Sequence, residues 1–547
     1  MNSNLIYKVK ISILLLIYLV PTIYSQDQTV GLFLNTKDSF NGYTLFSNNE
    51  VTYLIDNCGF KVNEWSTDLK PGLGIYLLED GNLLRTGRVD PPISFGGVGG
   101  AFELFDWDNN LIWRHEYDFD KGVPHHDITP LPNGNFLALT WEFYSEEEGT
   151  EAGLNFIGNI WSERIVEIKM AGTNEAEIVW EWKAWDHLVQ DMFPAADNYG
   201  VVSEHTELIH VNFFNPGTHN GNLDLFHLNS IDYNSELDQI VVSCRNFSEI
   251  WVIDHSTTSE ESASHQGGKW GKGGDLLYRY GNPRAYDRGD QNDQVFRKQH
   301  DAKWIFNDAF NEVAFSVFSN GSSATGSIVY YWQATTNSSG QYEMIDTNVF
   351  GPEEIQWSFT RPGLYSPIMS GAQYLENGNV LICEAGDGRF LEVNSEGEPV
   401  WEYINPSNSF GNPLAQGATV RNIDVFRATR YAPNYPAFEG RSLEPTVPVE
   451  INPWESDCEL YLNTNTILGE NISEISILGN PINDILTIQS NTSYQLKFTT
   501  INGQILKSKE LTEGITNIDV TSVQSGVYIL NFVNKAGFSH VTKIIKI

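Results

Sequence analysis

Apolar and polar residues alternate in short runs along most of the chain, and turns rich in glycine and asparagine separate these runs. Three copies are clearest: GIYLLEDGNLLRTG, ITPLPNGNFLALTWE and AQYLENGNVLICEAG. Each places a glycine (Gly81, Gly134 or Gly378) beside asparagine at a tight hairpin turn, where a positive φ is required. The pattern predicts short antiparallel strands throughout, and therefore an all-β protein.

A further pair of strands around an acidic turn follows each hairpin and ends in an aromatic residue. The six ends that we assign, three clear and three in divergent copies, are Trp113, Trp180, Trp401, Trp65, Tyr278 and Trp357. Units of four short strands with recurring glycine and aromatic positions favour a six-bladed β-propeller. We place it within residues 26–435. A tandem of β-sandwiches is the alternative.

Two long insertions interrupt the repeats, at residues 185–222 and 255–298. They are polar and poor in helix-forming patterns, so we expect both to lie over one mouth of the propeller. After a linker rich in proline and asparagine, residues 436–474, the strand pattern resumes with Asn-Gly and Ser-Gly turns. Residues 475–547 are therefore predicted to form a small C-terminal β-sandwich.

The net charge of the chain and its first 25 residues indicate where the protein acts and which partners it excludes. The 33 Lys+Arg and 70 Asp+Glu give a net charge of −37 that is spread along the chain, which argues against nucleic acid or an anionic membrane as a partner. Residues 1–25 have the pattern of an export signal, with Lys8 and Lys10 before an apolar run that is short for a membrane span. We expect cleavage near Ser25 and no stable membrane anchor.

The four cysteines, Cys58, Cys244, Cys383 and Cys458, have no CxxC spacing. A metal site is not expected from them, and disulfides are permitted without an assigned pairing. Cys244 is interpreted as a buried strand residue or half of a disulfide rather than a catalytic thiol. The acidic loops FDWDNN and DRGDQND allow calcium as an alternative, although neither matches a complete ligand loop.

Four polar residues stand at the heads of successive repeats: His126, His227, Arg245 and His300. Their surroundings read HHDITPLPNGN, FHLNSIDY, VVSCRN and QHDAKWI. Histidine and arginine are poor strand-core residues, so equivalent positions in several repeats indicate a shared polar centre. Arginine offers a rigid fork of donors to anionic oxygens, and imidazole can attack as a nucleophile or move a proton. The set suits transfer of a tetrahedral anionic group without a cofactor or metal. The remaining histidines that we interpret as surface or mouth residues are His115, His187, His205, His210, His219, His255 and His265.

In this order, these blocks resemble the bacterial arylsulfate sulfotransferases over about residues 40–430, most specifically in the FHLNSID and SxRN block that holds His227 and Arg245. The resemblance implies that a phenolic sulfate ester gives its sulfuryl group to a histidine and that a second phenol collects it, without an adenylated sulfate donor. By this resemblance His300 is the nucleophile, His227 and Arg245 hold the sulfuryl oxygens, and His126 completes the cluster, with His125 as an open alternative. Proton transfer falls to His227 or His126.

Aromatic residues near the mouth are candidates to stack on the substrate ring, although most are interpreted as packing residues: Tyr286, Phe296, Trp304 and Tyr365.

The tail resembles the type IX secretion sorting domain of Bacteroidetes. The residues that carry this resemblance are Asn480-Pro481, Asp484 to Leu486, Gly503, Gly526-Val527-Tyr528 and Lys543 to Lys546. The resemblance implies the type IX secretion machinery as a partner, export through both membranes to the cell surface or medium, and removal of the tail.

Two other functions stay open at this point. The chain is alternatively a non-catalytic secreted propeller that binds sulfated or phenolic glycans, or a sulfatase-like hydrolase in which water accepts the sulfuryl group. Fold alone does not choose between them, since propellers support many functions.

Overall fold

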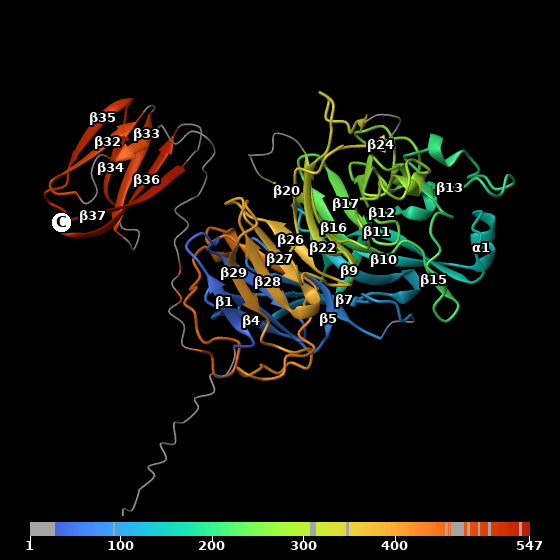
Figure 1. The fold of residues 1–547 in the computed structure, drawn as a ribbon, viewed down its shortest axis with the longest axis horizontal. Coiled ribbons are helices and arrows are strands. Elements are labelled where there is room, and N and C mark those ends of the chain that lie inside the picture. Colours follow the sequence, from blue (N-terminus) through green and yellow to red (C-terminus); the bar gives the residue numbers. More distant parts are fainter. Residues whose placement is uncertain are drawn as a thin grey trace, which may run out of the picture.

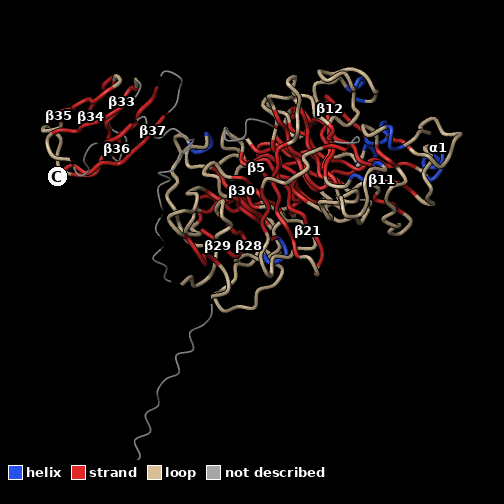
Figure 2. Tube along the Cα trace, turned by 45° about the horizontal axis from the view of Figure 1, so that its top comes forward, coloured by secondary structure: helices blue, strands red, loops and turns tan. Residues whose placement is uncertain are grey.

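The computed structural model describes residues 28–90, 93–306, 313–345, 349–454, 458, 460, 475–477, 482–490, 493–500, 505–534 and 539–547. The predicted export signal and much of the predicted linker lie outside these residues. In the described part strands dominate, and the two α-helices are short: α1 (Glu146–Glu151) and α2 (Ser259–Ser262) (Figures 1 and 2). The predicted all-β class is therefore confirmed. None of the described helices is long and apolar enough to cross a membrane.

Most strands between residues 31 and 431 belong to six antiparallel sheets whose four main strands are hydrogen-bonded in series. The first contains β30 (Ala428–Tyr431), β2 (Tyr43–Ser47), β3 (Val51–Ile55) and β4 (Lys61–Ser66). The second contains β5 (Pro71–Leu77), β6 (Leu83–Arg88), β7 (Gly100–Phe105) and β8 (Leu111–Glu116). The third contains β9 (Val123–Pro130), β10 (Phe136–Tyr144), β11 (Asn159–Ala171) and β12 (Glu175–Lys183), with β15 (Asn222–Asp224) added parallel to β11.

The fourth sheet contains β16 (Leu228–Asn234), β17 (Gln239–Cys244), β18 (Glu249–Asp254) and β19 (Tyr278–Tyr280). The fifth contains β20 (His300–Ile305), β21 (Ala314–Ser322), β22 (Gly326–Gln333) and β25 (Trp357–Phe359). The sixth contains β26 (Gly371–Tyr374), β27 (Val380–Glu384), β28 (Arg389–Val393) and β29 (Pro399–Ile404), with β1 (Gly31–Asn35) outside β29. Two small ladders join β13 (Leu188–Val189) to β14 (Ile209–His210) and β23 (Met344–Ile345) to β24 (Val349–Phe350).

The hairpin glycines adopt the predicted conformation, because Gly81, Gly134 and Gly378 have φ values of 88°, 86° and 86°. Several strands, including β7, β17 and β18, are buried at every residue. Burial on both faces of a strand requires covering layers on both sides, so neighbouring sheets pack face to face.

The six aromatic ends predicted from the repeat each lie in the fourth strand of a different sheet. Their side chains donate hydrogen bonds to the next unit along the chain, and the last one returns to the first sheet. The bonds are Trp65 Nε1 to Asp106 O, Trp113 Nε1 to Glu175 O, Trp180 Nε1 to Thr257 Oγ1, Tyr278 Oη to Gly351 O, Trp357 Nε1 to Ser395 O and Trp401 Nε1 to Asn57 O. The recurring aromatic residue therefore connects neighbouring units in a closed cycle.

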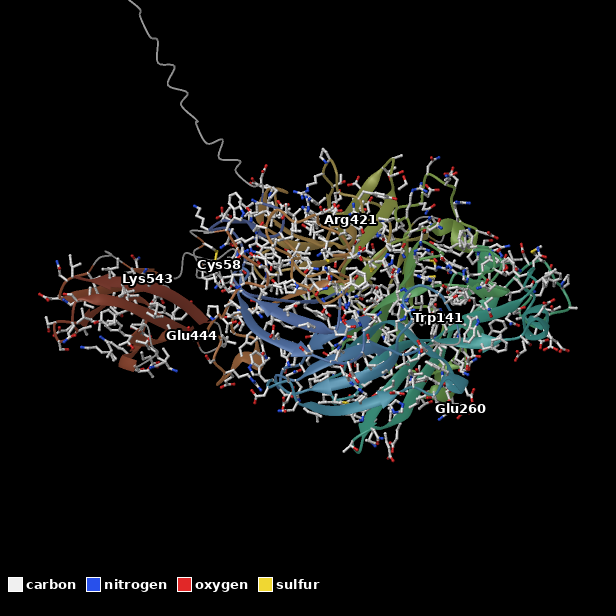
Figure 3. The ribbon with its side chains drawn as sticks, turned by 90° about the horizontal axis from the view of Figure 1, so that it is seen from below. Cys58, Trp141, Glu260, Arg421, Glu444 and Lys543 are labelled. Atoms are coloured by element: carbon white, nitrogen blue, oxygen red, sulfur yellow. A yellow bond between two sulfur atoms is a disulfide. The ribbon has the colours of Figure 1, made fainter. Side chains whose placement is uncertain are left out.

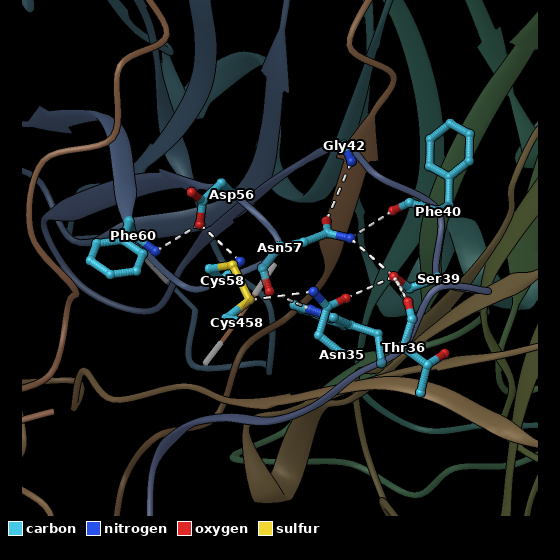
Figure 4. Close-up of a disulfide and its surroundings, with 11 residues drawn as sticks. Asn35, Thr36, Ser39, Phe40, Gly42, Asp56, Asn57, Cys58, Phe60 and Cys458 are labelled. Atoms are coloured by element: carbon cyan, nitrogen blue, oxygen red, sulfur yellow. Dashed lines mark hydrogen bonds between the residues drawn. A yellow bond between two sulfur atoms is a disulfide. The ribbon is translucent and has the colours of Figure 1, made fainter. Parts of the chain in front are cut away.

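The two ends of this region are joined by strand pairing. Strand β30 pairs with β2, and β1 pairs with β29, so a C-terminal strand enters the first sheet and an N-terminal strand enters the sixth. A disulfide between Cys58 and Cys458 spans 400 residues and adds a covalent link beside Asn57 (Figure 4). Cys244 and Cys383 are buried free thiols, in agreement with the prediction of a buried strand residue at position 244.

We expect the double variant Cys58→Ser/Cys458→Ser to lose about 2–4 kcal/mol of unfolding free energy, because the crosslink restricts a very long loop in the unfolded chain. Urea denaturation of the oxidised proteins measures this loss. A reductant should destabilise the wild type and leave the variant unaffected. Equal stability of wild type and variant without reductant would contradict the expectation.

The C-terminal strands form two further sheets, drawn as a group of their own in Figure 1. One contains β31 (Ile475–Ile477), β32 (Ile485–Ser490) and β35 (Gly514–Asp519). The other contains β34 (Ile505–Leu511), β33 (Tyr494–Thr500), β36 (Gly526–Asn534) and β37 (Ser539–Lys546). Buried residues of both sheets, among them Ile488 and Phe498, share one apolar cluster that is separate from the clusters of the larger region.

Of the insertions predicted to cover one mouth, 185–222 and 255–298, residues 255–277 leave their sheet at the opposite end and then pack against the first insertion, where the N–H of Leu276 donates to the carbonyl of Glu207. Strand β17 ends at Cys244, next to Arg245, and the antiparallel β18 runs back to Asp254 at the other end of the sheet. Residues 255–277 therefore leave the fourth sheet at the end away from Arg245. The hydrophobic pattern did not resolve this strand reversal.

Candidate functional site

The predicted histidines lie at irregularities in the first strands of three neighbouring sheets. The ladders of β9, β16 and β20 with their partners each shift register near His126, His227 or His300. His126 and His227 have positive φ values of 49° and 56°, and Asp301, directly after His300, has 57°. Bulges of this kind change the direction of a side chain, and left-handed backbone is unusual for residues other than glycine. The irregularities direct these residues to a common point.

The structure brings the four predicted residues together. The ring centroids of His126 and His227 are 4.7 Å apart. Burial lowers the pKa of His126 well below its usual value, and the nearby His227, His125, His300 and Arg245 lower it further. The shared centre predicted from the repeat is therefore present.

The structure also distinguishes the two adjacent histidines. His125 stacks on Trp141 at 3.8 Å, and its Nε2 lies 2.9 Å from Oε2 of the buried Glu163 (Trp141 is labelled in Figure 3). Its Nδ1 lies 2.9 Å from Nδ1 of His126. His125 is thus part of the wall behind the cluster, whereas His126 faces His227. Gly97 makes this position possible, because a Cβ there would lie 2.2 Å from the imidazole of His126.

His300 is held with a defined proton position. Its Nδ1 donates to Oδ1 of Asn320 at 2.7 Å, so the lone pair is on Nε2, which accepts from the backbone N–H of Met369 at 3.2 Å. Burial lowers the pKa of His300 to about 3, although the bond with Asn320 opposes this. His300 is therefore a neutral imidazole at physiological pH, with its lone pair placed on Nε2 by the bond to Asn320.

His227 and Arg245 are more accessible. Nδ1 of His227 donates to the carboxylate of Asp224, and its Nε2 has no hydrogen-bond partner among the described residues. Burial lowers the pKa of Arg245, and Asp224 opposes this, but arginine keeps its charge at any working pH. No carboxylate of the described residues forms an ion pair with Arg245; its guanidinium has only a 3.5 Å contact with Oδ1 of Asn246. A half-buried cation without an ion pair, beside the neutral imidazoles of His126 and His300, is suited to bind an anion.

Sequence reasoning missed Arg427, which lies behind the cluster. Its guanidinium binds both oxygens of Asp127 at 3.1 and 2.7 Å, and its Nε lies 2.6 Å from Oδ1 of Asp301. These aspartates directly follow His126 and His300, so one arginine joins the backbones that carry two site histidines. The carboxylates outweigh burial and raise the pKa of Arg427. The signal in the sequence was the His-Asp dipeptide that occurs at both site histidines. Two aspartates that are buried beside these histidines need a buried cation as a partner.

Several other predicted residues lie elsewhere. His187 and His210 are buried and His255 is nearly so, which corrects their assignment to the surface or mouth; His115 is half-buried and His219 is exposed. Among the aromatic candidates, Tyr286, Phe296 and Trp304 are buried in packing clusters, as most were interpreted to be. Tyr365 is half-buried and adjoins Ser366, whose carbonyl accepts from Asn320.

The corrected position of His255 gives a stability prediction. Its ring lies between Asp238, at 2.8 Å, and Glu167, at 3.1 Å. Burial lowers the pKa of His255, but the two carboxylates outweigh it and raise the pKa to about 9. The folded protein therefore holds this proton more tightly than the unfolded chain does. The resulting stability is complete below pH 6.5 and is lost as the pH rises through 9.

We expect His255→Gln to lose about 3 kcal/mol relative to the wild type at pH 6 and much less at pH 10. Urea denaturation across this range measures the difference between the two proteins, and His115→Gln is the matched control on a half-buried histidine of β8. A difference that does not depend on pH would contradict the assignment.

Comparisons with known proteins agree with this geometry. Residues 110–413, more than half of the chain, match the arylsulfotransferase (ASST) family. The match includes His126, His227, Arg245 and His300. The chain therefore belongs to the arylsulfotransferase family and is a sulfotransferase. Residues 476–547 match the secretion system C-terminal sorting domain, so the protein carries a tail for export to the cell surface or medium.

No curated protein matches the chain significantly. Solved structures with a similar course include a protein of unknown function from Bacteroides caccae, with a TM-score of 0.38 and 12% identity, covering 72% of this chain and 99% of that one. A periplasmic gluconolactonase from Pseudomonas aeruginosa has a TM-score of 0.33 and 10% identity, with 88% and 100% coverage. Virginiamycin B lyase from Staphylococcus aureus has a TM-score of 0.32 and 11% identity, with 69% and 89% coverage.

Proposed function

We propose that this protein transfers a sulfuryl group from a phenolic sulfate ester to a phenolic acceptor through a sulfated His300. The observation that carries the proposal is the pairing of a neutral imidazole, whose Nε2 lone pair is defined by Asn320, with the uncompensated cation of Arg245. The cation would hold the anionic sulfuryl oxygens, and the lone pair would attack sulfur. Family membership supports the reaction class.

In the first half-reaction Nε2 of His300 attacks sulfur, an N–S bond forms, and the bond from sulfur to the phenolic oxygen breaks. Charge on the sulfuryl oxygens is stabilised by Arg245, as in phosphoryl transfer, where positioning and electrostatics supply most of the catalysis. The N–H of Met369 now points at Nε2 and would turn to a sulfuryl oxygen once that nitrogen is bonded to sulfur. A phenol, with a pKa near 10, leaves more readily than an alcohol, which favours aryl esters as donors.

His227 is positioned to move the phenolic proton. In the first half-reaction the imidazolium form of His227, with Nδ1 donating to Asp224, would give its Nε2 proton to the departing phenolate, and in the second the neutral ring would take a proton from the incoming phenol and return to the imidazolium. The Asp224 carboxylate would stabilise the imidazolium form, as the carboxylate of a catalytic triad does. In the second half-reaction the acceptor oxygen bonds to sulfur, the N–S bond breaks, and His300 is regenerated. His126, which faces His227, completes the polar wall.

We further propose that the six sheets are the blades of a β-propeller over residues 26–435, followed by a linker, 436–474, and a C-terminal β-sandwich, 475–547. The closed cycle of aromatic hydrogen bonds and the two strand pairings that join the ends support this architecture. The site would lie on its axis, where first strands of neighbouring blades meet. The tail would be the part handled by the type IX machinery.

A chromogenic aryl sulfate tests the function. Release of the coloured phenol that depends on an added phenolic acceptor, with the sulfated acceptor as product, supports the transferase. Equal release in water alone would make the protein a hydrolase, and binding without release would make it a sulfate-binding module.

A further inference from the structure

A second cluster of titratable side chains uses none of the residues of the proposed sulfuryl site. It consists of His187 in a 3-10 turn (Ala184–His187), His265 in the segment after α2, and Asp275 before β19. In the described part of the chain it is the one group of at least three histidine, cysteine or acidic residues whose ligand atoms all lie within 4.8 Å of one another. The three residues are far apart in sequence, so their spacing gave no metal motif.

The hydrogen bonds of His187 direct its Nδ1 toward the other two residues of the cluster. Its Nε2 donates to the carbonyl of Ser262 at 2.9 Å, which leaves Nδ1 as the ring nitrogen on the side of the cluster. That Nδ1 faces Oδ1 of Asp275 at 2.8 Å, and Nδ1 of His265 lies 2.7 Å from the same oxygen. Ring protons or one metal ion can satisfy these two contacts, and a metal ion would be held by all three side chains at once. A metal-binding histidine commonly donates its other ring nitrogen to a backbone carbonyl, as His187 does.

The buried residue of the cluster, His187, is held in place by its packing. His187 is fully buried and lies parallel to Trp182, whose Nε1 donates to the carbonyl of Gly274 at 2.7 Å. A Cβ at Gly274 would lie 2.6 Å from Nε2 of His187, so glycine makes room for the ring. A metal site needs ligands that are fixed in this way.

The outer ligand is open to solvent. The side chain of His265 is 59% exposed, and it lines a surface hollow of about 450 Å³ together with Asp186, Tyr199 and His205. The hollow gives an ion a path to the buried pair. It also leaves room for a water molecule beside the three side chains.

We propose that His187, His265 and Asp275 bind a divalent transition-metal ion, with Zn²⁺ as the best match. Two imidazole nitrogens and a carboxylate oxygen are typical zinc ligands, and a water molecule from the hollow would complete four-coordination. Ligand atoms bound to zinc at about 2.0–2.1 Å lie roughly 3.3 Å apart, so the present contacts would widen by about half an ångström.

The ion would fasten two insertions to each other. Residues 184–210 and 255–277 already meet where the N–H of Leu276 donates to the carbonyl of Glu207. The first insertion continues to Asp224 and His227. Binding of the metal would therefore stabilise the start of the segment whose end forms part of the proposed sulfuryl site.

Calorimetric titration of chelator-treated protein with Zn²⁺ tests the proposal. We expect one ion per chain, a rise in melting temperature on binding, and, with Co²⁺ in its place, visible absorption typical of tetrahedral coordination. His265→Ala, which removes an exposed side chain and should fold normally, is expected to weaken Zn²⁺ binding by about a hundredfold or more, since even residues that only orient ligands change metal affinity 10–100-fold. Asp275→Asn should do the same.

His205→Ala is the matched control, because His205 lines the same hollow and contacts a carboxylate, Glu207, outside the cluster. Its Zn²⁺ affinity should equal that of the wild type. Absence of stoichiometric binding by the wild type, or wild-type affinity in both His265→Ala and Asp275→Asn, would overturn the proposal.

Discussion

Replacing His300 by glutamine is expected to reduce acceptor-dependent phenol release at least about 10⁴-fold, because the variant keeps a polar side chain but has no nucleophilic nitrogen. Substitution of a covalent nucleophile alone lowers kcat about as much as removal of all the catalytic residues, because the remaining groups have no nucleophile to activate. The loss should appear in kcat. Rates with a chromogenic aryl sulfate at saturating phenol measure it.

The intermediate gives a second readout. Wild-type protein mixed with donor alone should gain the mass of one SO₃ group at His300, and addition of phenol should remove it. His300→Gln should gain none. His115→Gln, on a half-buried histidine of β8 outside the cluster, should transfer and gain mass like the wild type. If His300→Gln retained more than about a tenth of the wild-type rate, the nucleophile would be another residue.

Replacing Arg427 by methionine is expected to cost about 3–5 kcal/mol of unfolding free energy, because the carboxylates of Asp127 and Asp301 would be left buried without a counter-charge. The rate of transfer should also fall about 100-fold in the protein that remains folded. These carboxylates hold the bulges that carry His126 and His300. A misplacement of catalytic groups by about 1 Å can lower the rate of a reaction about 100-fold. Urea denaturation and the chromogenic assay measure the two effects.

Two variants separate charge from geometry. Adding Asp127→Asn and Asp301→Asn to Arg427→Met should recover much of the stability, since the unpaired charges are removed, while the rate should stay low. Arg427→Lys keeps one charge but cannot bridge two carboxylates, so it should be stable and slow. Arg421→Met, at an exposed arginine labelled in Figure 3, should change stability by less than about 0.5 kcal/mol. Full activity of Arg427→Met would show that the aspartates position nothing.

Arg245 and Arg427 show how one residue type serves two purposes. Both are largely buried and lie near the same histidines. Arg427 is neutralised by two carboxylates, so it supports the site from behind, whereas Arg245 has no ion pair among the described residues and is free to bind an anion. Sequence context distinguished only Arg245, because its VVSCRN block resembles the family pattern.

The amino-acid sequence alone determined the strand-rich class, the hairpin turns at Gly81, Gly134 and Gly378, the six aromatic ends, and the four residues that meet at the candidate site. These features follow from local periodicity, from the backbone demands of tight turns and from repetition, all of which are visible along a single chain. The family and the sorting tail were visible for the same reason, since short motifs kept their order.

Tertiary structure alone decided which of His125 and His126 faces the cluster, which nitrogen of His300 carries the lone pair, and which cysteines pair. It also decided that Arg427 joins Asp127 to Asp301 and that His187, His265 and Asp275 meet. Each of these depends on contacts between residues tens to hundreds of positions apart, and on backbone irregularities that turn a side chain through a large angle. A pattern read along the chain carries neither kind of information.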